Sequence, residues 1–271
     1  MAMPQNMDVK DLGALLAEGM AAGRDAKASL FQLRVLAACL AGNVPDESFC
    51  AAAGEIRAER RDDGWLLSGR VPAALSSGGA VKQCIVLAGG GDEGWMSFRL
   101  SCDSPALRLD PVDSLDLLPA VDVQLDSARV GGGTALRRLE DHALVPALFA
   151  LSAELAGAAG AALDIALERV RVRKVFGRSI GAYQALAHRL VDARMDLDSM
   201  QLALDDMAHA GQDGAVARAM ALKTLCSQAG PRVVATAQQA HGGEGFHADV
   251  PLYRYTRRVQ GLCLRLGSRF S

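Results

Sequence analysis

The residues of this chain best suited to chemistry are an arginine and a pair of glycines, in two separate stretches. Arg173 carries a planar, permanently charged guanidinium whose fork of N–H donors suits a pyrophosphate. Gly242 and Gly243 lack side chains, so their backbone N–H groups can approach phosphate or ribose oxygens. Gln239, just before them, can both donate and accept hydrogen bonds. These residue types favour a phosphate-bearing ligand.

Each feature taken alone also has a plainer interpretation. An arginine after a helix is more often an ion-pair residue than a ligand, and a diglycine is more often an ordinary loop. His241 lies beside the glycines, but no cluster of ligands accompanies it, so we expect a structural role. The cysteines are scattered without a CxxC pair, which argues against zinc or iron–sulfur ligation and favours buried thiols.

Composition and charge narrow the class of protein. Lys and Arg number 29 and Asp and Glu 31, well mixed, which gives no electrostatic argument for nucleic acid. No run approaches the ~18–20 apolar residues of a membrane span, so we expect none. The start, Met1 to Lys10, has no basic stretch followed by an apolar one, so we expect a cytoplasmic protein without a secretory signal.

The elements that must position these residues indicate an α+β fold. Residues 8–53 have the apolar spacing of two or three helices. Residues 55–130 contain short, evenly spaced strands, which predict a small β-barrel or sandwich. The four clearest strands centre on Trp65-Leu66-Leu67, Cys84 to Ala88, Met96 to Leu100 and Val121 to Leu125.

The remainder is predicted to be helical. Gly131 to Gly133 is the expected linker, and Pro146 suits the first turn of a helix that runs to about Val172. Further helices are expected near residues 180–209, 214–240 and 251–266, which together make an antiparallel four-helix bundle. The predicted domains are a truncated N-terminal helical segment at 1–54, a β-domain at 55–130 and the C-terminal bundle at 131–271.

Two stretches carry a resemblance to a known family. The first reads Arg173-Lys174-Val175-Phe176-Gly177-Arg178-Ser179-Ile180, then Tyr183-Gln184; the second reads Gln239-Ala240-His241-Gly242-Gly243-Glu244-Gly245-Phe246. They resemble the bundle of the acyl-CoA dehydrogenase family, with its Arg-x-x-Phe-Gly-x-x-Ile turn and Gln-x-x-Gly-Gly-x-Gly-Phe loop. The resemblance covers roughly residues 55–271, because Asp63-Gly64-Trp65 and Asp126 to Val130 look like the opening and closing strands of the family's β-domain.

The resemblance implies a flavin site shared between subunits. In the family these motifs reach FAD held mainly by a neighbouring subunit, in an enzyme that dehydrogenates acyl-CoA at Cα–Cβ and passes electrons to an electron-transfer flavoprotein. The implied cofactor-binding residues are Arg173, Phe176, Gln184, Gln239, Gly242 and Gly243.

The chain departs from the family where the flavin ring would lie. Only about 54 residues precede the β-domain, and residues 43–48 keep little of the family's flavin-contacting Thr-Glu-Pro segment. The family's Trp-Ile-Thr/Ser segment lies against the ring, but Ala73-Ala74-Leu75 stand here. The aromatic wall and the hydroxyl donor are both missing.

The catalytic base is also missing from its family positions. Leu266 stands where most members have the glutamate that removes the α-proton, and Ala147 stands where a minority have it. Neither side chain accepts a proton. A base relocated to Glu154 or Glu140 is the alternative, although Glu154 lies two turns from Ala147.

These losses predict a non-catalytic subunit of a heteromeric acyl-CoA dehydrogenase, in which a full-length partner holds the ring, the acyl-CoA and the base. A heterotetramer is expected, similar to the mixed-subunit enzymes of bacteria that degrade steroid side chains, and a steroid-like acyl-CoA would then be the substrate. The alternatives are a non-enzymatic scaffold that uses the bundle for association, or a self-sufficient dehydrogenase with a relocated base.

Overall fold

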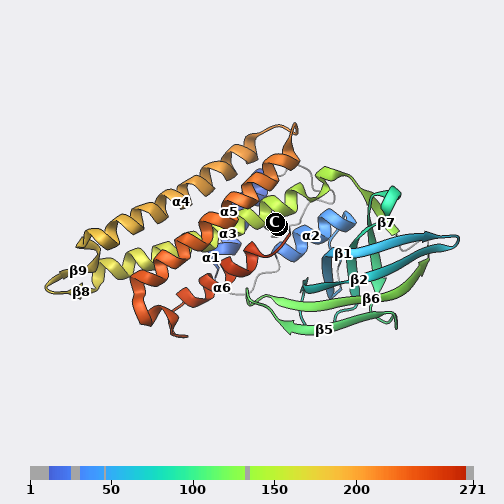
Figure 1. The fold of residues 1–271 in the computed structure, drawn as a ribbon, viewed down its shortest axis with the longest axis horizontal. Helices are drawn as coiled ribbons and strands as arrows, with labels where there is room; N and C mark the ends of the chain where they lie inside the picture. The colour runs from blue at the N-terminus through green and yellow to red at the C-terminus, as the bar shows by residue number, and fades with distance from the viewer. Residues whose placement is uncertain (1–11, 26–30, 46, 132–134, 267–271) are drawn as a thin grey trace. The chain divides into compact units, whose positions relative to one another are not determined.

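The computed structural model describes residues 12–25, 31–45, 47–131 and 135–266 (Figure 1). The chain folds as two compact units, and the expected α+β class is confirmed. One unit comprises the described residues within 29–114 and 118–147, and the other those within 12–28, 115–117 and 148–271. The predicted three-part division at residues 54 and 130 stays a prediction.

The first unit is built on a seven-stranded sheet with the order β5-β6-β2-β1-β3-β4-β7. The strands are β1 (Phe49–Arg61), β2 (Gly64–Ser76), β3 (Gln83–Gly89), β4 (Trp95–Ser101), β5 (Leu107–Asp113), β6 (Pro119–Gly131) and β7 (Ala135–Leu139). Strands β5 and β7 are the two edges, and within the described residues they do not pair with each other. Of the two predicted forms, a barrel or a sandwich, the barrel is wrong, because the sheet stays open among the described residues.

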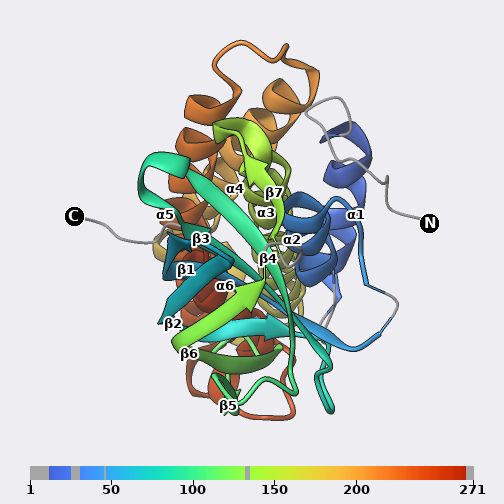
Figure 2. The same cartoon turned by 90° about the vertical axis from the view of Figure 1, so that its right-hand side faces the viewer.

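The open sheet builds a core by curving, as Figure 2 shows. Alternate residues such as Trp65, Leu67 and Val71 face one hydrophobic cluster. The rings of Trp65 and Phe98 meet edge-on with centroids 5.5 Å apart, although their strands β2 and β4 are not neighbours in the sheet. Helix α2 (Phe31–Ala41) is almost wholly buried and packs on this unit.

Two strands replace predicted helix. The helical prediction through residue 53 is wrong from Phe49 on, because β1 starts there and pairs in parallel with β3. Residues 49–52 are buried, so this Ala-rich run lacks the alternation that would mark a strand. Strand β7 pairs with β4 after the predicted glycine linker, so the chain does not turn helical there. Residues 132–134 of that linker lie outside the described part.

The second unit is the expected bundle. Its helices are α3 (Val145–Val172), α4 (Gln184–His209), α5 (Ala215–His241) and α6 (Leu252–Cys263). Pro146 lies in the first turn of α3, and the predicted end at Val172 is confirmed. In Figure 1, α4 and α5 run side by side along the bundle.

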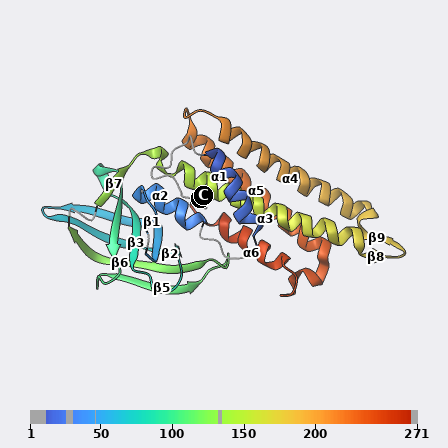
Figure 3. The same ribbon diagram turned by 180° about the vertical axis from the view of Figure 1, so that it is seen from behind.

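Helix α1 (Leu12–Arg24) belongs to the bundle unit, whereas α2 belongs to the sheet unit (Figure 3). The predicted N-terminal helical segment is thus divided between the two. Glycines let α1 and α3 touch by their backbones. A Cβ on Gly23 would lie 2.0 Å from the Glu154 carbonyl oxygen, and one on Gly157 would lie 2.2 Å from that of Met20.

The expectation that no segment is apolar enough to span a membrane is wrong for one helix. The stretch His142–Val172 is long enough, and it contains an 18-residue window with a mean hydropathy of 1.6. However, 89% of its apolar window is buried inside the structure. Such burial is typical of the central helix of a bundle, where every face packs against protein.

Candidate functional site

The first motif forms a two-stranded hairpin after α3. Strands β8 (Lys174–Val175) and β9 (Arg178–Ser179) pair across a two-residue turn. Both turn residues have positive φ, 52° at Phe176 and 79° at Gly177. Positive φ is unfavourable for a bulky residue such as Phe176. Phe176 is also 93% exposed, so its ring packs on little of the described protein. The hairpin thus presents an aromatic ring to the surroundings.

The neighbouring chain holds this hairpin in place. The Tyr183 hydroxyl donates to the Val175 carbonyl at 2.9 Å, and the Arg178 guanidinium lies 4.0 Å from the centroid of the Tyr183 ring. A short helical turn (Ile180–Ala182) then leads to Gln184, the exposed first residue of α4.

The second motif caps the end of α5. Gly242 has φ 63° and ψ −146°, which an L side chain rarely adopts, and its N–H donates to the Gln238 and Gln239 carbonyls. The loop continues as a short helix, Gly242–Phe246. A Cβ at Gly242 or Gly243 would meet nothing within 4 Å, so the space above the diglycine is open.

An ion pair joins the last turn of α3, just before the first motif, to the second motif at the end of the bundle that carries the β8–β9 hairpin (Figure 1). Arg169, in the last turn of α3, binds Glu244 of the diglycine loop at 2.5 Å. Arg173 follows one turn later; its side chain is exposed and has no hydrogen bond or ion pair to the described residues. The predicted cation and the predicted backbone donors therefore occupy the same end.

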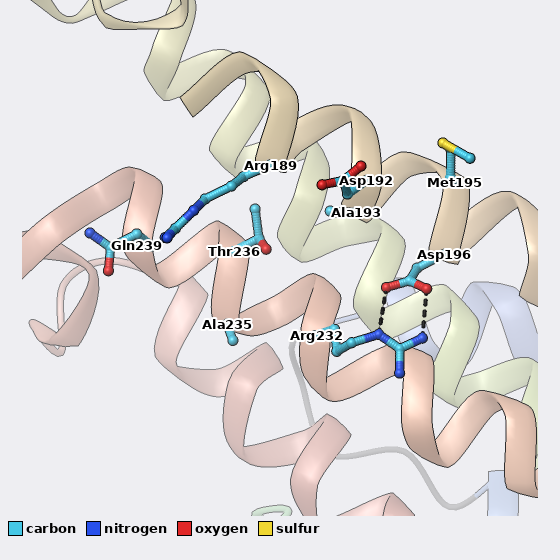
Figure 4. Close-up of a pocket in the computed structure, with 9 residues that line it drawn as sticks. All are labelled: Arg189, Asp192, Ala193, Met195, Asp196, Arg232, Ala235, Thr236 and Gln239. Atoms are coloured by element: carbon cyan, nitrogen blue, oxygen red, sulfur yellow. Dashed lines mark hydrogen bonds and ion pairs between the residues drawn. The ribbon is translucent and has the colours of Figure 1, made fainter. Parts of the chain in front are cut away.

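A groove of about 710 Å³ between α4 and α5 ends at Gln239 (Figure 4). Inside it, Arg232 donates from Nε and Nη2 to the two Asp196 oxygens at 2.8 and 2.6 Å. This pairing raises the pKa of Arg232. Arg189 extends from α4 toward α5 near Thr236 and Gln239 (Figure 4). Sequence reasoning missed Arg189, because only the fold places its helix beside Gln239.

Both family positions for the catalytic base lack a proton acceptor. Ala147 is 1% exposed in the first turn of α3, and Leu266 follows α6 with φ 48°. Glu140, one alternative, is exposed and precedes the short helix Asp141–Leu144.

The other alternative, Glu154, lies in the bundle core. Its carboxylate is fully buried, and its Oε1 accepts from Arg258 Nε at 2.9 Å and also from Nη2. The Arg258 side chain is 4% exposed. A buried carboxylate held by a buried guanidinium has the arrangement of a structural ion pair joining α3 to α6.

The positions aligned with the family's ring-contacting segment lie in β2. Ala73 sits at an irregularity in the pairing with β6, with φ 49°. Its N–H donates to Asp122 Oδ1 at 2.9 Å, and this bond, with Arg70 second, lowers the pKa of Asp122. Leu75 is 7% exposed and contributes to the core. Neither side chain supplies an aromatic face or a hydroxyl.

The hairpin end fits the diphosphate of a dinucleotide such as FAD. It combines the exposed guanidinium of Arg173, which has no partner among the described residues, with open space above the backbone of Gly242 and Gly243. Gln239 adds an exposed amide beside the groove. The cofactor roles of these residues, and those of Phe176 and Gln184, stay predictions.

The sequence of this chain is similar to that of acyl-CoA dehydrogenases and a related desulfinase. Residues 142–268 match the family described as acyl-CoA dehydrogenase, C-terminal domain. Over 87% of its length the chain is 29% identical to 3-sulfinopropanoyl-CoA desulfinase of Paraburkholderia xenovorans, of which it spans 66%. Over 76% it is 27% identical to probable acyl-CoA dehydrogenase fadE25 of Mycobacterium leprae, of which it spans 57%. The chain thus spans between half and two thirds of these relatives.

Solved structures of two-protein complexes are similar as well. A variant of the Tcur3481-Tcur3483 steroid ACAD has 28% identity and a TM-score of 0.78, covering 93% of this chain and 76% of the other. The ChsE4-ChsE5 complex from Mycobacterium tuberculosis has 24% identity, the same coverage and a TM-score of 0.78, and so supports the fold. Residues 142–268 thus match the C-terminal domain of acyl-CoA dehydrogenases, and proteins named acyl-CoA dehydrogenase or ACAD are similar to this chain over most of its length.

Proposed function

We propose that this chain is the non-catalytic subunit of a heteromeric, FAD-dependent acyl-CoA dehydrogenase. The observation that carries the proposal is a contrast within one chain. The end of the bundle suited to a diphosphate is intact and open, whereas Ala147 and Leu266 occupy the base positions and Glu154 is bound by Arg258. A subunit that completes a partner's flavin site needs an open end that can bind the diphosphate, but it does not need a catalytic base of its own.

The similar structures support a protein partner. Both are named as pairs of different proteins, and one is named a steroid ACAD. We therefore propose a full-length acyl-CoA dehydrogenase as partner, in a cytoplasmic heterotetramer, and a bulky, steroid-like acyl-CoA as substrate. An electron-transfer flavoprotein is the proposed acceptor.

The chain's own residues would bind and orient the cofactor. Arg173 would pair with the diphosphate, the Gly243 N–H would donate a backbone hydrogen bond to it beside the open backbone of Gly242, and Gln239 would contact the adenosine end. When bound, FAD accepts the hydride that leaves Cβ of the acyl group. The proton at Cα would go to a carboxylate of the partner, because this chain has none at the family positions.

Replacing Arg173 by alanine tests the proposed site. In the assembled complex we expect FAD to bind about 10- to 150-fold more weakly, because one charge-assisted hydrogen bond to phosphate is lost, worth roughly 1.5–3 kcal/mol. The measurement is the FAD dissociation constant, from flavin fluorescence. Arg171→Ala, which removes an exposed charge from the same turn of α3, is the matched control and should change it less than about threefold. Equal effects of the two variants would contradict the assignment.

A further inference from the structure

A carboxylate stands directly after the diglycine. Glu244 follows Gly243, in the loop that has open space above its glycine backbone. A negative charge there opposes the binding of a diphosphate, since like charges repel across the few ångströms of one residue. A loop suited to an anion therefore requires this charge to be compensated.

Arg169 is placed to compensate it. Its Nη2 lies 2.5 Å from Glu244 Oε2, and its side chain is 24% exposed against 58% for Glu244. Its Nε is buried and has no hydrogen-bond partner among the described residues. Arg169 thus forms an ion pair with Glu244, whereas Arg173, one helical turn later, has no ion-pair partner in the described part of the chain.

The loop has a second anchor that does not involve charge. Gly245 is buried so closely that a Cβ would lie 2.4 Å from Gln238 Oε1. Gln238 in turn donates from Nε2 to Thr256 Oγ1 of α6 at 2.9 Å. This packing does not depend on the ion pair, so we expect the loop to stay on the bundle when the charges are removed.

We propose that Arg169 is a positioning residue that keeps the diglycine loop receptive to the diphosphate of FAD by binding and neutralising Glu244. This inference rests on the proposed function of the bundle. It assigns different tasks to two arginines of one helix end. Arg173 contacts the diphosphate of the cofactor directly, whereas Arg169 acts indirectly by neutralising Glu244.

The test is a charge-removal cycle in the complex with the full-length partner, read as the FAD dissociation constant. Arg169→Gln should weaken FAD binding about tenfold, because Glu244 is left uncompensated beside the diglycine. Glu244→Gln should change it less than about threefold. The double variant, Arg169→Gln with Glu244→Gln, should return to within about threefold of wild type. In about 1 M salt, where the screening length is roughly 3 Å, the loss in Arg169→Gln should shrink.

A purely structural ion pair gives a different result. Its two single variants would weaken FAD binding equally, and the double variant would not recover; this pattern would overturn the inference. So would an Arg169→Gln variant that binds FAD normally while Arg173→Ala binds it weakly. If Arg173→Ala also binds normally, the proposed flavin site itself is wrong. Hydrogen exchange of the Gly242–Phe246 amides in the chain alone checks the position of the loop in each variant, and we expect unchanged protection.

Discussion

Replacing Arg258 by alanine is expected to lower the free energy of unfolding of the chain by about 3–5 kcal/mol. The change leaves the Glu154 carboxylate, which is fully buried, without the guanidinium that donates to its Oε1 at 2.9 Å. A buried charge without a counter-charge is far more costly than the loss of a surface ion pair. Urea unfolding followed by circular dichroism measures the effect.

Two further variants make this result specific. Arg254→Ala removes an exposed arginine one turn earlier on α6 and should cost less than about 0.5 kcal/mol. Replacing both partners, by Glu154→Leu with Arg258→Met, should recover most of the loss, because no charge is then buried. If Arg258→Ala costs less than 1 kcal/mol, the pair does not stabilise the core as described.

Removing the glutamate that the full-length partner holds at the family's base position is expected to lower turnover of the complex about 10²–10⁴-fold. Loss of the α-proton from a thioester needs a positioned carboxylate, and in the proposed enzyme only the partner supplies it. In this chain, Glu140→Gln should leave turnover within about threefold of wild type. Glu154→Gln should do the same per folded complex, although it lowers stability because it disturbs the pair with Arg258.

The reverse substitution completes this prediction. Leu266→Glu in the chain alone should create no dehydrogenase activity, since Ala73 and Leu75 still offer the ring no aromatic wall and no hydroxyl. The opposite outcome has a clear meaning. If Glu154→Gln abolishes turnover while assembly and FAD content are unchanged, this chain carries a relocated base and is a catalytic subunit.

The bundle could be predicted from the sequence because its signals are local. Pro146 marks the first turn of α3, and Gly211 and Gly214 interrupt the helical pattern between α4 and α5, so these elements follow the prediction to within a few residues. The start of β1 could not be predicted the same way. Residues 49–52 are all buried, and such a run has no period that separates strand from helix.

The features that depend on tertiary contacts could not be predicted from the sequence. Nothing in the sequence of α1 shows that Gly23 packs against α3. Likewise, nothing in the sequence around Glu244 shows that it forms an ion pair with Arg169. Glu154 is an intermediate case. It is a lone charge in the apolar first half of α3, which indicates a buried and paired residue, but its partner Arg258 is 104 residues away. Its sequence position alone made it a candidate base.

The flavin content of the purified chain, with and without its partner, tests the central claim most directly. The account predicts that the chain alone is colourless, because it lacks the contacts to the flavin ring, and that the complex with a full-length acyl-CoA dehydrogenase is yellow. In that complex, Arg173→Ala should lose the visible flavin band more readily than Arg171→Ala. One FAD per chain in a homogeneous preparation of this protein alone would contradict the account, as would a complex whose flavin content does not depend on this chain.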